Sequence, residues 1–123
     1  MTTQEVANQL VQYCRTGQNA KAYDELFAPN AVALEPEGAP MQRVEGLPAL
    51  KDKSQHFQDS IQEVHANEVS DPMVADGHFC VRMMMDATFK GGGRMQFDEL
   101  CLYKVEHGKI TEEQFFYPVR SQT

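Results

Sequence analysis

Hydrophobic residues near the start of the chain recur at the spacing of one helical face, which predicts a helix over residues 3–16. Thr2 and Glu5 have the spacing of a capping box, in which a hydroxyl and a carboxylate satisfy backbone amides at the start of a helix. Gly17 is typical of a residue that ends a helix. The apolar face of this helix consists of Val6, Leu10, Tyr13 and Cys14.

A second helix is predicted over residues 19–28, and it is expected to end before Pro29, because proline disfavours a helical conformation in the preceding residue. A short strand is expected over Ala31–Glu35, followed by a loop that contains proline and glycine. A third helix is predicted from Pro48, since proline suits the first helical turn. The apolar stripe of the third helix consists of Leu50, Phe57 and Ile61.

From Val64 onward the apolar pattern changes to alternation, which is typical of strands. Asp76-Gly77 and His107-Gly108 are two-residue hairpin signals, because glycine tolerates the positive φ of such turns. Gly91-Gly92-Gly93 indicates a looser turn, and Pro72 marks a bulge or a sheet edge. The pattern therefore predicts a meander of four strands, over residues 64–75, 78–89, 95–105 and 109–118.

The strand over residues 78–89 has one almost purely apolar face, which is expected to look toward the helices. This face consists of Phe79, Val81, Met83, Met85, Ala87 and Phe89. Across the His107-Gly108 turn, even positions of one strand are expected to share a face with odd positions of the next. One face would then carry Asp98, Leu100, Leu102, Glu113, Phe115 and Tyr117, and the other Phe97, Cys101, Tyr103 and Phe116.

Both faces of the predicted sheet thus carry large apolar residues, whereas an antiparallel sheet with one solvated side alternates more strictly. The helices can cover one face. A second copy of the chain is the economical covering for the other, so we expect a homodimer formed through the convex side of the sheet.

The composition narrows the classes of partner and the setting. The chain has 123 residues, which favours a single domain over residues 1–123. Its 11 basic and 18 acidic residues give a net charge of −7, which argues against binding to nucleic acid and to anionic membranes. Three cysteines without metal-ligand spacing, and no signal peptide or membrane-length apolar run, favour a reduced, cytoplasmic setting.

Two stretches carry a resemblance to a known family. Residues 22–32, AYDELFAPNAV, look like a helix followed by an F-A-x-D/N-A-V signature and a strand. Residues 103–110, YKVEHGKI, with Phe116-Tyr117-Pro118 after them, look like a final hairpin, and Gly46 matches a further common position. In order and spacing the whole chain resembles the nuclear transport factor 2-like superfamily, and within it the SnoaL-like group of small bacterial proteins.

This resemblance implies an α+β, cystatin-like fold, with a cone-shaped, mostly antiparallel sheet, three N-terminal helices covering a pocket, and frequent dimerisation. Relatives include ketosteroid isomerases, polyketide cyclases, dehydratases and epoxide hydrolases, as well as binding modules without chemistry, so the fold by itself implies no single activity. The residues expected to line the pocket are Leu10, Tyr13, Phe57, Met83, Met85, Leu100, Glu113, Phe115 and Tyr117.

Glu35 falls where the ketosteroid isomerases place their carboxylate base, and a carboxylate in an apolar pocket has a raised pKa suited to proton transfer. The oxyanion donors of those enzymes fall at Leu10 and Leu100, which cannot donate a hydrogen bond, so steroid isomerase activity of that kind is rejected. Tyr13 is a shifted candidate donor. The Arg82 and Asp86 pair does not have the spacing of the epoxide hydrolases.

Each candidate acid also has a plainer interpretation. Glu35 is either a pocket acid or a solvated residue at a strand end. Asp98 and Glu113 are either pocket acids or rim residues paired with Lys104 or Arg94. No cluster has metal-ligand spacing, and neither a metal nor another cofactor is predicted.

The leading hypothesis is a SnoaL-like protein that binds a small, largely apolar ligand in an acid-bearing pocket. If it is an enzyme, it is a cofactor-independent isomerase, cyclase or lyase that transfers a proton, with Glu35 and Asp98 as catalytic residues. The competing hypothesis is a dimeric binding or scaffold module without catalysis. A weaker third interpretation is one subunit of a larger oxygenase, which would need a metal-bearing partner.

Overall fold

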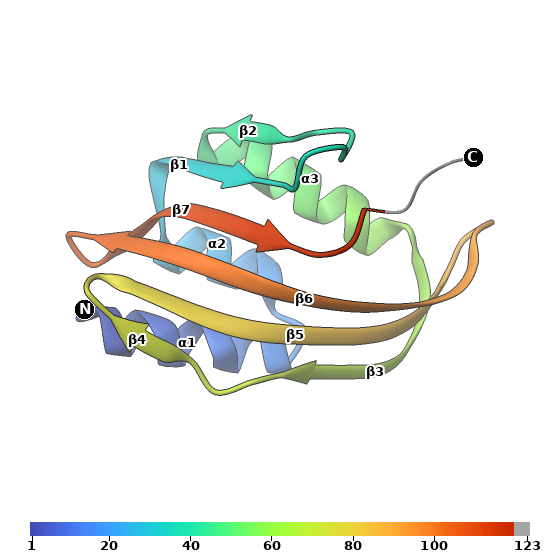
Figure 1. The fold of residues 1–123 in the computed structure, drawn as a ribbon, viewed down its shortest axis with the longest axis horizontal. Coiled ribbons are helices and arrows are strands. Elements are labelled where there is room, and N and C mark those ends of the chain that lie inside the picture. The colour runs from blue at the N-terminus through green and yellow to red at the C-terminus, as the bar shows by residue number, and fades with distance from the viewer. Residues whose placement is uncertain (120–123) are drawn as a thin grey trace.

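The computed structural model describes residues 1–119, which form three helices and one curled, unclosed, mostly antiparallel sheet of seven strands (Figure 1). The helices are α1 (Thr3–Arg15), α2 (Asn19–Leu26) and α3 (Leu47–Asp59). The strands are β1 (Phe27–Leu34), β2 (Arg43–Glu45), β3 (Ile61–Val69), β4 (Met73–Ala75), β5 (His78–Phe89), β6 (Gly93–Glu106) and β7 (Lys109–Phe116). This arrangement confirms the predicted α+β class.

The strands lie in the order β2-β1-β7-β6-β5-β3, and β4 pairs with β5 beside β3. Among the strands of residues 1–119, only the β1–β7 pair is parallel, because the chain returns from β6 to lie beside the strand that follows the second helix. The three helices lie behind the sheet in the view of Figure 1. The concave side of the sheet therefore faces the helices, as the family resemblance implies.

Helix α1 forms as its sequence predicts. The Thr2 hydroxyl accepts from the Glu5 amide at 3.1 Å, and the Glu5 carboxylate accepts from the Thr2 amide at 2.9 Å, which confirms the capping box. The predicted apolar face is buried against the sheet, with Val6 and Leu10 almost completely inaccessible to solvent. Burial of this stripe, more than helical propensity, holds so short a helix in place.

Three segment boundaries differ from the prediction. Helix α2 ends at Leu26, and Phe27 already begins β1, so Pro29 lies within the strand rather than after the helix. The pairing of β1 with β7 shifts between Phe27 and Val32, and proline fits such an irregular stretch because it cannot donate to a regular ladder. Ile61 begins β3 instead of extending α3.

The predicted strand over residues 64–75 is two strands, β3 and β4, with Pro72 between them. Both pair with β5, so the proline lies at the sheet edge, as expected. Strand β2 was not predicted, because its three residues fall in the stretch that was interpreted as loop. The strand exists because it pairs with β1, and the three residues of β2 alone do not indicate this pairing.

The two predicted hairpin turns are confirmed. Asp76 and Gly77 have φ of 47° and 68°, and His107 and Gly108 have φ of 51° and 75°. Positive φ at both central residues is the geometry of a two-residue turn that follows the twist of its flanking strands.

The register beyond the His107-Gly108 turn differs from the prediction by one residue. Val105 pairs with Ile110, but the next pair is Lys104 with Glu112, so Thr111 is an extra residue in β7. Such a bulge turns every later side chain of the strand to the other face. The predicted sharing of a face by Asp98 and Leu100 with Glu113, Phe115 and Tyr117 is therefore wrong.

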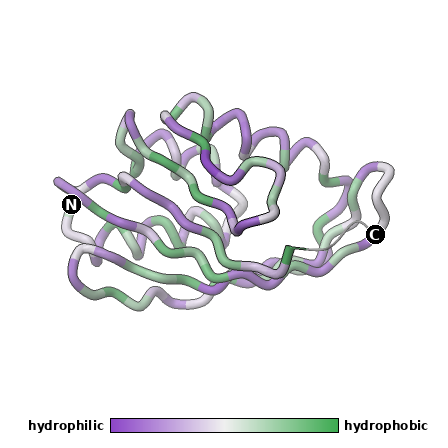
Figure 2. The backbone as a smooth tube through the Cα atoms, turned by 45° about the horizontal axis from the view of Figure 1, so that its top comes forward, coloured by the Kyte–Doolittle hydropathy of each residue, from purple (hydrophilic) through white to green (hydrophobic). Residues whose placement is uncertain are grey.

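The actual concave face brings Tyr103 opposite Glu113 and Cys101 opposite Phe115, whereas Leu100 pairs with Phe116 on the convex face. Strand β5 follows its prediction, since Phe79, Val81 and Ala87 are buried toward the helices. Hydrophobic and hydrophilic stretches alternate along both helices and strands (Figure 2), as expected when each element has one buried face.

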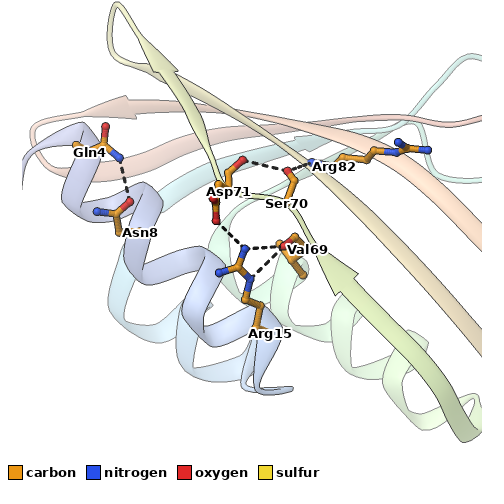
Figure 3. A network of polar contacts seen from close by, with 7 residues as sticks. All are labelled: Gln4, Asn8, Arg15, Val69, Ser70, Asp71 and Arg82. Carbon is orange, nitrogen blue, oxygen red and sulfur yellow. Dashed lines mark hydrogen bonds and ion pairs between the residues drawn. The ribbon is translucent and has the colours of Figure 1, made fainter.

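Arg15 joins the end of α1 to the sheet edge (Figure 3). Its guanidinium donates to the Val69 carbonyl at 2.8 and 3.1 Å and to the Asp71 carboxylate at 2.9 Å. The Ser70 hydroxyl accepts from the Arg82 amide at 2.8 Å, so β3 is also held to β5 past its regular ladder. These contacts fix one wall of the space between helices and sheet.

No helix within residues 1–119 is long and apolar enough to cross a membrane.

Candidate functional site

A cavity of about 510 Å³ lies between the helices and the concave face of the sheet. All three helices and strands β1, β3, β5, β6 and β7, or the residues that directly follow β1 and β7, contribute to its walls. Its volume falls in the range of cavities that enclose a small organic molecule. The protein's own side chains therefore leave the hollow of the sheet open.

Most of the wall is apolar. Met83 and Met85 project from β5, because they belong to the inward set of alternating residues, and Phe57 reaches the same space from α3. Phe57, Phe89 and Phe97 pack with ring centroids 5.5–6.1 Å apart. Methionine and aromatic side chains make a wall that adapts to ligands of different shape.

The polar groups gather around the ends of β1 and β7. Glu35, one residue past β1, forms an ion pair with Lys53 of α3, and its side chain is only 11% exposed. Only one Glu35 oxygen takes part in this contact. The other, Oε2, is buried and has no hydrogen-bond partner among the described residues. A buried acceptor without a partner is costly, so this oxygen is open to a donor from a ligand.

Glu113 is the most deeply buried acid of the site, with 3% of its surface exposed. It lies on β7 opposite Tyr103, and its Oε1 accepts a hydrogen bond of 2.8 Å from the Tyr23 hydroxyl of α2. Burial raises the pKa of Glu113 to about 7, and the Tyr23 hydrogen bond and the Lys53 charge only partly oppose this rise.

Glu99 lies on β6, two residues before the buried Cys101 on the same face, and lines the cavity. Burial, reinforced by the negative charge of Glu35, raises the pKa of Glu99 to about 7. A carboxyl group with a pKa near 7 can both donate and accept a proton near neutral pH. Glu99 and Glu113 are therefore suited to general acid–base chemistry.

The remaining titratable neighbours stay protonated near neutral pH. Burial, followed by the Glu113 charge, raises the pKa of the Cys14 thiol to about 12. Burial also raises the pKa of the Tyr117 phenol, with the nearby Glu35 carboxylate as the next cause. These groups can donate hydrogen bonds but do not add negative charge to the cavity.

The structure places most of the predicted pocket residues on the cavity wall. Tyr13 is not one of the lining residues, because its hydroxyl donates to Glu25 at 2.9 Å. The role of any of these residues in binding a ligand stays a prediction. The predicted residues on the wall are Leu10, Phe57, Met83, Met85, Glu113, Phe115 and Tyr117, together with Glu35.

Asp98 and Leu100 were predicted to face the pocket, and this prediction is wrong. Asp98 points to the convex side, where Arg82 donates to its two oxygens at 2.8 and 2.6 Å. This arginine holds the pKa of Asp98 below its usual value. Leu100 lies on the same side, 46% exposed. The physical reason is the register with β5, where Asp98 and Leu100 pair with Met84 and Arg82, which belong to the outward set of that strand.

Sequence reasoning missed Glu99, Lys53 and Tyr23. Alternation along β6 places Glu99 with Phe97, Cys101 and Tyr103, so an acid within an apolar set was a usable signal. Lys53 lies on the part of α3 that its polar pattern assigns to solvent, and no local signal shows that it reaches Glu35. Within residues 1–119 no three His, Cys, Asp or Glu side chains are arranged to hold a metal ion.

Comparisons with known proteins agree with this geometry. A family model described as the SnoaL-like domain matches residues 1–117. A crystal structure from Mesorhizobium loti, named as a SnoaL-like polyketide cyclase, is 38% identical, with a TM-score of 0.88 and coverage of 95% of this chain and 100% of that one. A search of curated proteins finds no match.

Two more distant structures share the fold. An NTF2-like protein of unknown function from Burkholderia pseudomallei is 11% identical, with a TM-score of 0.77 and coverage of 96% of this chain and 92% of that one. A protein with a ketosteroid isomerase-like fold from Catenulispora acidiphila, in complex with trimethylamine, is 20% identical, with a TM-score of 0.74 and coverage of 96% and 88%.

The raised pKa of Glu113 predicts a pH-dependent stability for Glu113→Gln. The folded carboxyl takes up its proton near pH 7 and an unfolded one near 4.5, so wild-type stability falls as the pH rises between these values. Glutamine keeps an acceptor for Tyr23 without the charge. The variant is expected to be more stable than wild type by up to about 3 kcal/mol near pH 8, with little difference near pH 4.

Urea unfolding at the two pH values measures this effect. Glu112→Gln is the matched control. Glu112 lies on the convex side, opposite Lys104 of the neighbouring strand, and its substitution should change stability little at either pH. Equal stability of Glu113→Gln and wild type near pH 8 would show that Glu113 carries no penalty for its charge.

Proposed function

The chain belongs to the SnoaL-like domain family, and from this premise we propose that it binds a small, largely apolar molecule in the cavity and transfers a proton at its acidic end. One observation carries the proposal. Glu35, Glu99 and Glu113 converge at one end of an otherwise apolar cavity, and two of them have a pKa of about 7. Buried acids with such values are typical of sites that act on a ligand.

The binding part of the proposal is supported by the walls of the cavity. Met83, Met85 and Phe115 offer apolar surface, and an enclosed apolar ligand would gain roughly 25 cal/mol for each Å² removed from water. A further support is that the Catenulispora acidiphila protein, which shares this fold, forms a complex with the small molecule trimethylamine.

The chemical part assigns the carboxyl groups to different roles. Glu35 has a free, buried oxygen and acts as the base that accepts a proton from a carbon or oxygen of the ligand. Glu99 or Glu113, protonated about half of the time near neutral pH, returns a proton at another position. The reaction class is that of a cofactor-independent isomerase, cyclase or lyase. Leu10 and Leu100 supply no oxyanion donor, so Tyr117 is the candidate donor in this cavity.

The second candidate function is a binding module without catalysis. The Tyr23–Glu113 hydrogen bond and the Lys53–Glu35 pair favour it, because they compensate these acids without any substrate. Both candidates place the ligand in the same cavity, so they differ only in chemistry. The three cysteines are free, which supports a reducing, cytoplasmic setting for either function.

We further propose that two copies associate through the convex face. Leu100 and Phe116 are direct cross-strand neighbours there, and each is 46% exposed. Arg82 lies opposite Leu100 on β5 and is already paired with Asp98, so a second copy can cover this part of the face without leaving the arginine unpaired. A two-fold arrangement would place the same patch on both sides of the contact.

A tryptophan at Met85 is expected to weaken binding of a neutral apolar probe, because the larger side chain would occupy part of the cavity. Met84→Trp is the matched control, since Met84 lies next to it on β5 but belongs to the outward set. Fluorescence titration with N-phenylnaphthylamine measures binding. Wild-type binding that both variants retain equally would place the probe outside the cavity.

Glu99→Gln is expected to slow proton transfer by roughly 10²-fold or more, whereas Asp98→Asn should leave it unchanged. These two neighbours lie on opposite faces of β6. A difference in rate between the two variants therefore reports on the cavity and not on a general disturbance of the strand. The measurement is protein-catalysed deuterium exchange at carbon next to a carbonyl, followed by proton NMR over a panel of apolar ketones. Binding without exchange in wild type would favour the second candidate function.

Light scattering at micromolar concentration tests the association. Wild type is expected to have the mass of a dimer, and Leu100→Lys, which places a charge in the exposed patch, is expected to have the mass of a monomer. A monodisperse wild-type monomer would refute the proposed contact.

A further inference from the structure

Acidic side chains outnumber basic ones among the described residues that line the cavity. Within the described part of the chain, the carboxyl groups of Glu35, Glu99 and Glu113 face a single ammonium group, that of Lys53. Among residues 1–119 no arginine or histidine lines this space. The other titratable groups that face it are Cys14 from α1, Tyr23 from α2, Tyr103 from β6 and Tyr117 just after β7, with Cys101 of β6 beside Glu99. All of these are neutral when protonated, so none supplies a second positive charge.

The unpartnered oxygen of Glu35 lies within this acidic group. Among residues 1–119 its Oε2 is buried and has no hydrogen-bond partner, although Lys53 contacts the same carboxylate and the Tyr117 hydroxyl lies near it. A ligand that brings a hydrogen-bond donor would satisfy this atom, and a charged N–H group makes a stronger bond to a carboxylate than a neutral one. A ligand that brings another acceptor would leave the oxygen unpaired.

The aromatic residues of the cavity favour the same ligand chemistry. The Lys53 ammonium already lies 5.2 Å from the centroid of the Phe115 ring, so this ring accepts a cation on its face. Tyr23 and Tyr103 also line the cavity near the acids. Carboxylates together with aromatic faces are the groups that recognise cationic nitrogen in proteins.

We propose that the molecule bound here presents a cationic nitrogen, such as a protonated amine, to Glu35, Glu99 and Glu113, and an apolar ring or chain to Met83, Met85 and Phe115. This inference rests on the ligand-binding function proposed above and names its ligand class. An anionic ligand would instead meet three carboxyl groups with only Lys53 in compensation.

Binding of such a cation is linked to protonation. Glu99 and Glu113 each have a pKa of about 7 in the free protein, and a neighbouring positive charge favours their ionised forms. The bound cation therefore releases protons from the cavity. Its affinity is expected to rise as the pH increases from about 6 to about 8, whereas the affinity of an anion of the same shape is expected to fall.

Three naphthalene derivatives with the same apolar body test the proposal by calorimetry: naphthylmethylamine, naphthalenemethanol and naphthoate, which are cationic, neutral and anionic near neutral pH. The amine is expected to bind wild type at least tenfold more tightly than the naphthoate near pH 7.5. Lys53→Met, which removes the one cation that residues 1–119 bring to the cavity, is expected to tighten amine binding further. Lys104→Met is the control for net charge, because Lys104 pairs with Glu106 on the convex face.

The outcomes separate this inference from the function on which it rests. Binding of the naphthoate or the alcohol as tightly as the amine, with the binding of all three weakened by Met85→Trp, would overturn the cationic ligand class and leave the cavity as a binding site. Weaker amine binding in Lys53→Met would also overturn it. Failure of all three probes to bind wild type would refute the proposed binding function, and the inference with it.

Discussion

Carboxyl groups that are held out of water at one end of an apolar cavity impose the main energetic constraint on this protein. Ionising an isolated carboxyl in such surroundings is costly, so each acid needs a partner or a proton. Lys53 supplies a charge for Glu35, Tyr23 donates to Glu113, and Glu99 and Glu113 retain protons up to about pH 7. The stability of the fold and the chemistry of the cavity are thereby linked to the same protons.

The one-residue bulge at Thr111 decides which acids experience this constraint. It aligns Glu113 with Tyr103 on the concave face and turns Glu112 to the convex face. In a regular hairpin, Glu112 would lie opposite Tyr103 in its place, and Glu113 would face the convex side. A feature of local geometry thus selects the acidic residues around which the proposed function is built.

Much of the architecture is predictable because its signals are local. The capping box of α1, the glycine turns at Gly77 and Gly108 and the alternation of β5 each depend on a few neighbouring residues, and the structure has all of them. The curved sheet and the pocket were predicted from the family resemblance. The end of α2 and strand β2 were misjudged because long-range pairing outweighs local preference there.

The candidate site was predictable only in part, for the same reason. Glu35 could be placed from a family motif at the end of a strand. Glu99 lies within an apolar set of β6, but only the pairing of β6 with β5 shows that this set faces the cavity. Lys53 looks like one more polar residue on a solvated helix face, and only the folded chain brings it to Glu35.

The titration of the glutamate side chains tests the central claim most directly. In a protein labelled with ¹³C at the glutamate carboxyl groups, NMR follows each carboxyl through its own pH range, and Glu99→Gln and Glu113→Gln assign the two signals. We expect the carboxyl groups of Glu99 and Glu113 to titrate near pH 7. If both Glu99 and Glu113 titrated near pH 4.5, the value of an ordinary glutamate, the cavity would not hold its acids away from water and the account would be wrong.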